Sequence, residues 1–193
     1  MSENPETKMP CDEKLIEAIQ AGDATAFERL VRRHGDRFFN LALRLSGSHA
    51  DADDILQEAF MRLWRNPFAW KPEGGLFTTW FYRVLVNLFL DYRRRLRKTE
   101  GDDILTDIVD GSANAEDRLL HDEQGHALIK AVSQLPPKQN VAVQLYYYDD
   151  FSQAEAAAVM KMHVKAFESL LYRARQRLKK DLLRKEGQTS RKK

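Results

Sequence analysis

The sequence has little of what disulfide-stapled, metal-bound or membrane-inserted proteins require. It contains a single cysteine, Cys11, so no disulfide can form within the chain. Its five histidines lack the paired spacing of a zinc site. No apolar run approaches the ~20 residues that cross a bilayer, and the N-terminus lacks a basic stretch followed by an apolar one. We therefore expect a cytoplasmic protein with no metal, no cofactor and no membrane insertion.

The net charge is small, but the charged residues are distributed unevenly along the chain. The net charge is +2, yet a basic cluster is followed by an acidic stretch over 100–123 that contains nine acids and one base, Arg118. After Lys161 basic residues dominate again. The first cluster consists of Arg93, Arg94, Arg95, Arg97 and Lys98. This arrangement favours two polyanion-binding surfaces joined by a segment that polyanions repel, although solvated helix faces are the alternative interpretation.

Apolar residues recur at helical spacing up to Arg97, and no alternating strand pattern interrupts them. The spacing predicts amphipathic helices over about 15–19 and 27–45, punctuated by Gly22 and Asp23, with Gly47 as the C-terminal cap. A third helix is expected from about Asp51 to Asn66, where Pro67 ends it. After a proline- and glycine-rich loop, a fourth helix is expected from about 78 to 97.

Periodicity returns at residue 127 and predicts three further helices over about 137–148, 152–160 and 164–184, with a proline at the start of the first. The predicted fold is therefore all-α with two small domains. A four-helix domain spans residues 12–98 and a helix-turn-helix domain spans 125–184. A flexible acidic linker over 99–124 joins them, and a disordered basic tail covers 185–193.

The last two of these helices have the spacing of a helix-turn-helix. Ser152 and Glu155 form a capping box, and the short turn 161–163 separates two helices with buried stripes. The inner positions are Ala156, Val159, Met160, Phe167, Leu170, Leu171, Ala174 and Leu178. The outer, groove-facing positions are Lys165, Glu168, Ser169, Tyr172, Arg173 and Gln176, and Arg177 and Arg184 extend them as a phosphate-binding ridge. An ordinary helical hairpin is the alternative.

The fourth helix has a second chemically distinctive face. Its inward side comprises Phe81, Val84, Leu85, Leu88 and Tyr92. Its opposite side carries Trp80, Arg83, Asn87 and Arg94. An indole, guanidiniums and a carboxamide provide stacking, phosphate pairing and base-edge hydrogen bonds to single-stranded nucleic acid. The preceding loop adds Phe68, Trp70 and Phe77, where a flipped base could be caught. A solvated face with a half-buried tryptophan is the alternative.

The third helix presents a mixed surface opposite its core face. The core positions are Ile55, Leu56, Ala59 and Leu63; the outer positions are Asp54, Gln57, Glu58, Met61 and Arg65. A methionine among mixed charges suits an adaptable protein interface better than DNA, which the acids would repel. A solvated face with one stray methionine is equally consistent with the pattern.

Taken in order, these segments resemble the extracytoplasmic-function sigma factors of bacteria over about 12–182. DADDILQEAFMRLWR resembles the segment that binds core RNA polymerase, which implies that Asp54, Gln57 and Glu58 face the β′ clamp. FTTWFYRVLVNLFLDYRRR is similar to the segment that melts and reads the minus-ten element, with Asn87 at a base-reading position. LPPKQNVAVQLYYYDDFSQAEAAAVMKMHVKAFESLLYRAR resembles the minus-thirty-five-binding domain, with Ser169, Tyr172 and Arg173 toward the major groove.

The sequence departs from this pattern where Lys161 replaces the usual turn glycine and Glu168 a frequent basic residue. A left-handed lysine costs ~1 kcal/mol, and a glutamate can accept from a cytosine amino group, so we expect a shifted promoter preference.

The resemblance implies a transcription initiation factor that performs no covalent chemistry and has no small-molecule substrate. Its implied partners are core RNA polymerase, promoter DNA and an anti-sigma factor. A free-standing helix-turn-helix regulator is the first alternative. A helical hydrolase or nucleic-acid-modifying enzyme is the second, but no catalytic set supports it: His121 and His126, for example, are off the i, i+4 metal spacing.

Overall fold

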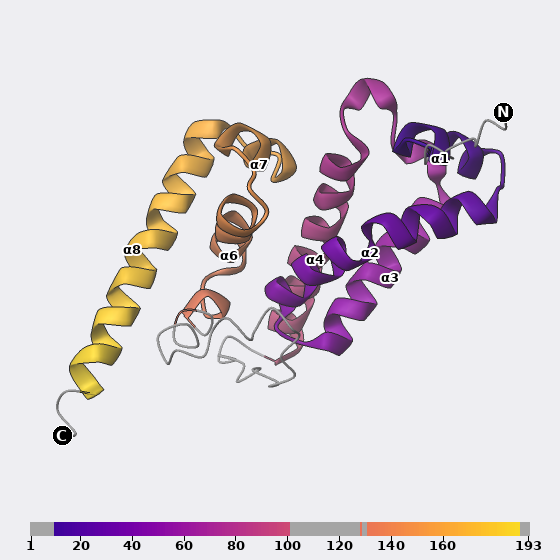
Figure 1. Ribbon diagram of the computed structural model, residues 1–193. Helices are drawn as coiled ribbons and strands as arrows, with labels where there is room; N and C mark the ends of the chain where they lie inside the picture. The colour runs from indigo at the N-terminus through magenta and orange to yellow at the C-terminus, as the bar shows by residue number, and fades with distance from the viewer. Residues whose placement is uncertain (1–9, 101–127, 129–130, 190–193) are drawn as a thin grey trace, which may run out of the picture.

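The computed structural model describes residues 10–100, 128 and 131–189, and all regular structure in these ranges is helical. Helices α1 to α4 form one half of the protein, and α6, α7 and α8 form the other (Figure 1). The two halves lie against each other, with α4 packed on both α6 and α7. The all-α, two-domain prediction is confirmed.

The N-terminal half consists of α1 (Asp12–Gln20), α2 (Ala24–Ser46), α3 (His49–Arg65) and α4 (Phe77–Glu100). Local chemistry sets their ends. The Asp23 side chain caps α2 by accepting from the backbone N–H groups of Thr25 and Ala26, at 2.8 and 3.1 Å. Gly47 ends the same helix in the left-handed conformation with a φ of 77°, as its position in the sequence predicts.

Aromatic side chains form the centre of the N-terminal core. Phe38 of α2 stacks on Phe81 of α4 with ring centroids 4.4 Å apart, and Phe60 of α3 lies 4.7 Å from the same ring. Asp12 ties α1 to α2 by accepting from Arg33 at 2.6 Å and by pairing with His34 at 2.8 Å. The core thus fixes α3 and α4 relative to each other and leaves their outer faces available.

The C-terminal half consists of α6 (Pro137–Val143), the π-helical turn η4 (Gln144–Tyr148), α7 (Gln153–Val159) and α8 (Val164–Thr189). Pro137 occupies the first turn of α6, as predicted. The expected helix over 137–148 changes to π geometry at Gln144. Helix α8 ends at Thr189, so residues 185–189, which the sequence assigned to the tail, are its last turn.

The expected linker lies outside the described residues except for Thr99 and Glu100, which are the last two residues of α4. Residues 190–193 also lie outside them.

Helix α4 is buried on two sides, not on one as its sequence suggested. Besides the expected inward residues, Tyr82, Val86 and Phe89 are at most 1% exposed. Tyr82 contacts Phe151, and Phe89 lines a small cavity of about 20 Å³ together with Leu135 of the C-terminal half. The second stripe is apolar because the C-terminal half covers it.

Candidate nucleic-acid and polymerase interfaces

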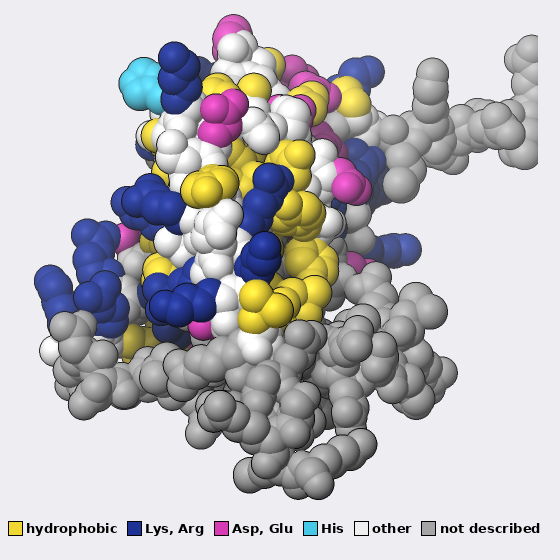
Figure 2. Space-filling view, turned by 90° about the vertical axis from the view of Figure 1, so that its left-hand side faces the viewer, with side chains coloured by type: hydrophobic (Ala, Val, Ile, Leu, Met, Phe, Trp, Pro, Cys, Tyr) yellow, Lys and Arg dark blue, Asp and Glu magenta, His cyan; other side chains and the backbone are white. Residues whose placement is uncertain are grey.

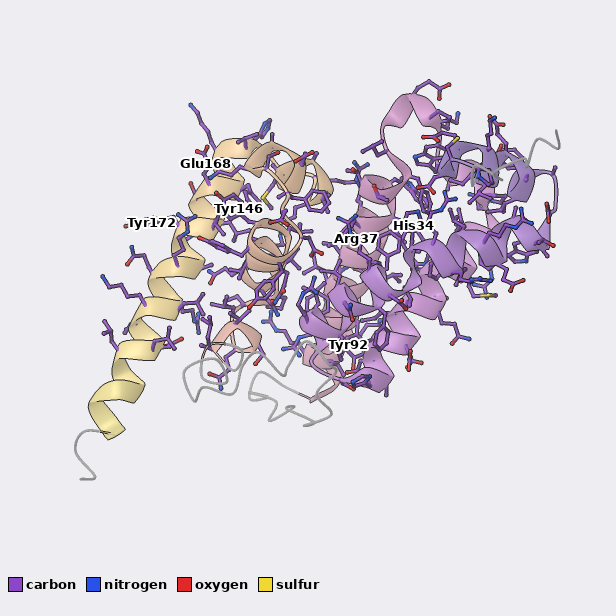
Figure 3. The ribbon with its side chains drawn as sticks, in the orientation of Figure 1. His34, Arg37, Tyr92, Tyr146, Glu168 and Tyr172 are labelled. Carbon is purple, nitrogen blue, oxygen red and sulfur yellow. The ribbon has the colours of Figure 1, made fainter. Side chains whose placement is uncertain are left out.

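Helix α8 presents its predicted groove-facing residues to solvent. Figure 2 shows the side of the molecule that carries α8, where lysine and arginine side chains line much of the surface. Glu168 and Tyr172 project outward from the helix (Figure 3), and Tyr172 is 61% exposed. All the predicted minus-thirty-five residues are exposed: Lys165, Glu168, Ser169, Tyr172, Arg173 and Arg177. Four of them, Glu168, Ser169, Tyr172 and Arg173, line one shallow depression.

The opposite face of α8 is the predicted buried stripe. Phe167, Leu171 and Ala174 are at most 1% exposed, and Ala156 and Val159 of α7 are fully buried. On the outer face, the Ser169 hydroxyl donates to the Lys165 carbonyl at 2.9 Å, and the Arg173 Nε donates to the Ser169 carbonyl at 3.2 Å. These bonds hold both side chains along the helix surface while the rest of the guanidinium remains available to a ligand.

A capping box begins α7, and a short turn with a left-handed residue joins α7 to α8. The Ser152 hydroxyl accepts from the Glu155 backbone N–H at 3.3 Å, and the Ser152 N–H donates to the Glu155 carboxylate at 2.9 Å. The hydrogen bonds from Ser152 lower the pKa of Glu155, so the box is intact at neutral pH. Lys161 is left-handed with a φ of 51°, as expected for the residue in the usual glycine position.

The predicted single-strand stripe on α4 is partly covered. Asn87 and Arg94 are exposed, whereas Trp80 and Arg83 are half-buried. The Trp80 ring packs 6.0 Å from Phe77, and Arg94 pairs with Asp91 one turn earlier. The Arg83 Nε is buried and has no hydrogen-bond partner within the described part of the chain. The accessible polar groups of this stripe are therefore those of Asn87 and Arg94, which are exposed.

The loop before α4 corrects one expectation. Trp70 and Phe77 are 3% and 1% exposed and pack edge to face at 6.1 Å, so they are core residues and cannot catch a flipped base. The Trp70 indole donates to the Gly75 carbonyl at 3.1 Å, which closes the loop on itself. Phe68 remains available at 62% exposure. Leu76, 66% exposed, was missed because a lone leucine after two glycines carries no sequence signal.

Helix α3 presents the predicted mixed surface. Asp54, Gln57, Met61 and Arg65 are exposed, and Glu58 is partly exposed. Glu58 accepts from the Arg62 Nε at 2.8 Å and lies 3.8 Å from Arg65; the Arg62 hydrogen bond lowers the pKa of Glu58. Trp64, 39% exposed, adds an aromatic edge that the sequence reading missed. Its spacing from Met61 and Gln57 could have revealed it.

None of the helices in the described ranges combines the length and apolar character that crossing a membrane requires.

The chain matches two family models in the order that the three surfaces imply. Residues 30–99 match sigma-70 region 2, and residues 125–178 match sigma-70 region 4. The first match contains the exposed faces of α3 and α4, and the second contains the helix-turn-helix. The fold and these faces therefore define a protein of the sigma-70 class.

Curated relatives narrow the class. SigE of Mycolicibacterium smegmatis, an extracytoplasmic-function RNA polymerase sigma factor, is 33% identical over 94% of this chain and 73% of its own. The sigma-E factor of Escherichia coli is 30% identical over 86% of this chain and 91% of its own, and SigW of Bacillus subtilis is 28% identical over 88% and 95%. This chain belongs to the extracytoplasmic-function sigma factors and directs transcription initiation by RNA polymerase, which supports the main prediction over the free-standing regulator.

A solved structure agrees with this assignment. CnrH, determined in complex with the cytosolic domain of CnrY, has a TM-score of 0.63 and 27% identity, and the match covers 89% of this chain and 96% of CnrH.

Proposed function

We propose that the three exposed faces divide the work of promoter recognition. The α3 face, Asp54, Gln57, Glu58, Met61 and Arg65, docks on the β′ clamp of core polymerase. The α4 stripe, Trp80, Arg83, Asn87 and Arg94, binds the separated strand of the minus-ten element. The α8 face, Lys165, Glu168, Ser169, Tyr172, Arg173 and Arg177, enters the major groove of the minus-thirty-five element.

One observation carries this proposal: each face lies on its own helix, the α3 and α8 faces and the Asn87 and Arg94 positions of α4 are turned to solvent, and each helix buries another side in the core. Residues on one face of α8 reach successive base edges, as in other helix-turn-helix readers. The mixed charge of the α3 face disfavours DNA and favours a protein. The protein itself makes and breaks no covalent bond and acts in the cytoplasm, where polymerase and promoter meet.

The structurally similar CnrH was solved in complex with the cytosolic domain of CnrY. We propose that this chain has an anti-sigma partner as well. Such a partner inhibits if it covers the polymerase-binding face or either DNA-binding face.

The test is run-off transcription with purified core polymerase on a promoter that the chain selects from a fragment library. Asn87→Ala removes a base-reading carboxamide and is expected to impair strand opening, seen as lost permanganate reactivity, with near-normal closed-complex formation. Arg173→Ala is expected to weaken closed-complex formation by about tenfold, the effect of one charged contact at a base or phosphate. Arg32→Ala, an exposed arginine of α2, is the control. Indistinguishable defects in the two variants would contradict the division of labour.

A further inference from the structure

The two domains meet through a buried ionic contact as well as through apolar surface. Asp149 follows the π-helical turn η4, and its backbone N–H donates to the Gln144 carbonyl at 3.1 Å, which fixes the aspartate at the end of that turn. The Asp149 side chain is only 6% exposed although it carries a charge. It is buried against the N-terminal domain.

Two residues of the N-terminal domain satisfy this carboxylate. An Arg44 terminal nitrogen donates to both Asp149 oxygens at 3.0 Å, and the Tyr82 hydroxyl donates to one of them at 2.9 Å. Arg44 also donates from Nε to the Gln144 side-chain oxygen at 3.0 Å. One guanidinium therefore binds two residues of the other domain with directional bonds.

The surroundings hold this contact in place. The Arg44 guanidinium lies 5.5 Å from the Tyr148 ring centroid, and the Tyr82 ring meets Phe151 at 4.8 Å. On the other side, Arg37 donates from Nε to the Tyr82 hydroxyl at 2.7 Å; Arg37 lies where α2 passes α4 (Figure 3). Because loss of either partner would leave a buried charge uncompensated, the pairing strongly favours this arrangement of the two domains over one in which only one of the charges stays buried.

We propose that Asp149, held by Arg44 and Tyr82, is a latch that closes the two domains on each other and keeps the free protein inactive until polymerase separates them. In this closed form, the C-terminal domain of the same chain covers the apolar stripe of Tyr82, Val86 and Phe89 on α4. No second protein is needed for this closure.

The inhibitory part rests on the proposed function and on distance. Packed helices lie about 8–10 Å apart, and α7 packs between α4 and α8, so the axes of the two reading helices are roughly 20 Å apart. The minus-ten and minus-thirty-five elements are about 25 base pairs apart, roughly 85 Å of duplex at about 3.4 Å per base pair. The closed form cannot span them, so promoter binding at both elements requires the latch to break.

The direct test is a distance measurement on the full chain without polymerase or DNA. Nitroxide labels at Asp53→Cys on α3 and Gln176→Cys on α8, in a Cys11→Ser background, place one probe on an exposed site of each domain. Double electron–electron resonance is expected to give one narrow distribution for this parent protein. A broad distribution in the parent would overturn the closed form itself.

The latch is then tested by substitutions that remove one charge or one hydroxyl. Asp149→Asn and Arg44→Gln are each expected to raise the open fraction at least tenfold, and Tyr82→Phe to raise it less. The double variant Arg44→Gln/Asp149→Asn should open less than the sum of its singles, because both remove the same ion pair. Asp150→Asn is the matched control, since Asp150 is an exposed acid one residue away and its left-handed backbone suits asparagine. Narrow distributions in all latch variants would overturn the latch.

If Asp149→Asn or Arg44→Gln fails to fold, as a loss of helical circular dichroism would show, Tyr82→Phe still tests the latch, because it removes only a single hydroxyl. Transcription supplies the second readout: the chain concentration for half-maximal run-off should fall several-fold in Asp149→Asn and stay unchanged in Asp150→Asn. Opening without this gain would overturn the inhibitory role. If the parent protein supports no transcription, the proposed function fails, but the distance measurement still decides the latch.

Discussion

At the scale of single residues, Tyr82 joins the two domains through a hydroxyl that must stay protonated. Burial and the neighbouring Asp149 carboxylate raise the pKa of Tyr82 above its ordinary value of 10.0, although Arg37 opposes this shift. Since the folded protein then holds this proton more tightly than the unfolded chain, the stabilisation is complete below pH 10 and is lost as the pH rises further.

We therefore expect Tyr82→Phe to lower the free energy of unfolding by about 1–2 kcal/mol at pH 8, through loss of a hydrogen bond to a charged group. The gap between the two proteins should narrow above about pH 10. Urea titrations of both proteins from pH 8 to pH 11 measure this. A gap that stayed constant to pH 11 would mean that the hydroxyl does not titrate differently in the folded state.

Lys161 is the second residue with a specific consequence. Its φ of 51° lies in the left-handed region, which glycine adopts without steric cost. Lys161→Gly should raise the free energy of unfolding by about 0.5–1 kcal/mol, whereas Gln176→Gly in the middle of α8 should lower it by a similar amount. Thermal unfolding of the two variants checks the opposite signs, and a destabilised Lys161→Gly would contradict the reading of this turn.

Residue-level prediction succeeded where local chemistry decides and failed where the tertiary environment does. The capping box at Ser152 and the left-handed Lys161 follow from short-range spacing, and both are present. Trp70 and Phe77 were expected beside the nucleic acid but are core, because the loop folds back on itself through the bond from Trp70 to Gly75. No sequence pattern distinguishes a buried loop aromatic from an exposed one.

At the scale of elements, α4 shows why a helical wheel has limits. Of its expected inward residues, Phe81, Leu85 and Leu88 are buried and Val84 and Tyr92 are partly buried. In addition, Tyr82, Val86 and Phe89 form a second buried stripe. Apolar residues on two sides of one helix indicate two neighbours, and the sequence does not say that the second neighbour is the C-terminal half, where Asp149 lies 67 residues after Tyr82. Helix ends were predicted within a few residues, because Asp23, Gly47 and Pro67 mark them locally.

The α3 face gives the element-scale prediction. Asp54 is exposed and lies on the face proposed for core polymerase, so reversing its charge should disturb that contact without harming the fold. We expect Asp54→Lys to weaken binding to core polymerase about tenfold in a fluorescence binding assay. Glu17→Lys, the same charge reversal at an exposed site of α1, is the control. Equal binding by Asp54→Lys and the unaltered protein would remove this face from the interface.

At the scale of the whole molecule, two modest helical domains are closed on each other by one buried ion pair and an apolar stripe. The sequence pointed to two domains but not to their contact, because Arg44 and Asp149 are far apart in sequence and each resembles a surface charge. The closed form is too short to span the two promoter elements. On this account, binding to polymerase separates the two domains so that both elements can be bound at once. Each domain then raises the effective concentration of the other at the promoter.

The most direct test of this account compares promoter binding and transcript synthesis with and without core polymerase at matched salt. With polymerase, the chain should select discrete promoters and start transcripts at defined positions. Alone, it should bind the same fragments weakly, non-specifically and with strong salt dependence. Tight, specific binding by the chain alone, or polymerase that gains no promoter selectivity from it, would contradict the account.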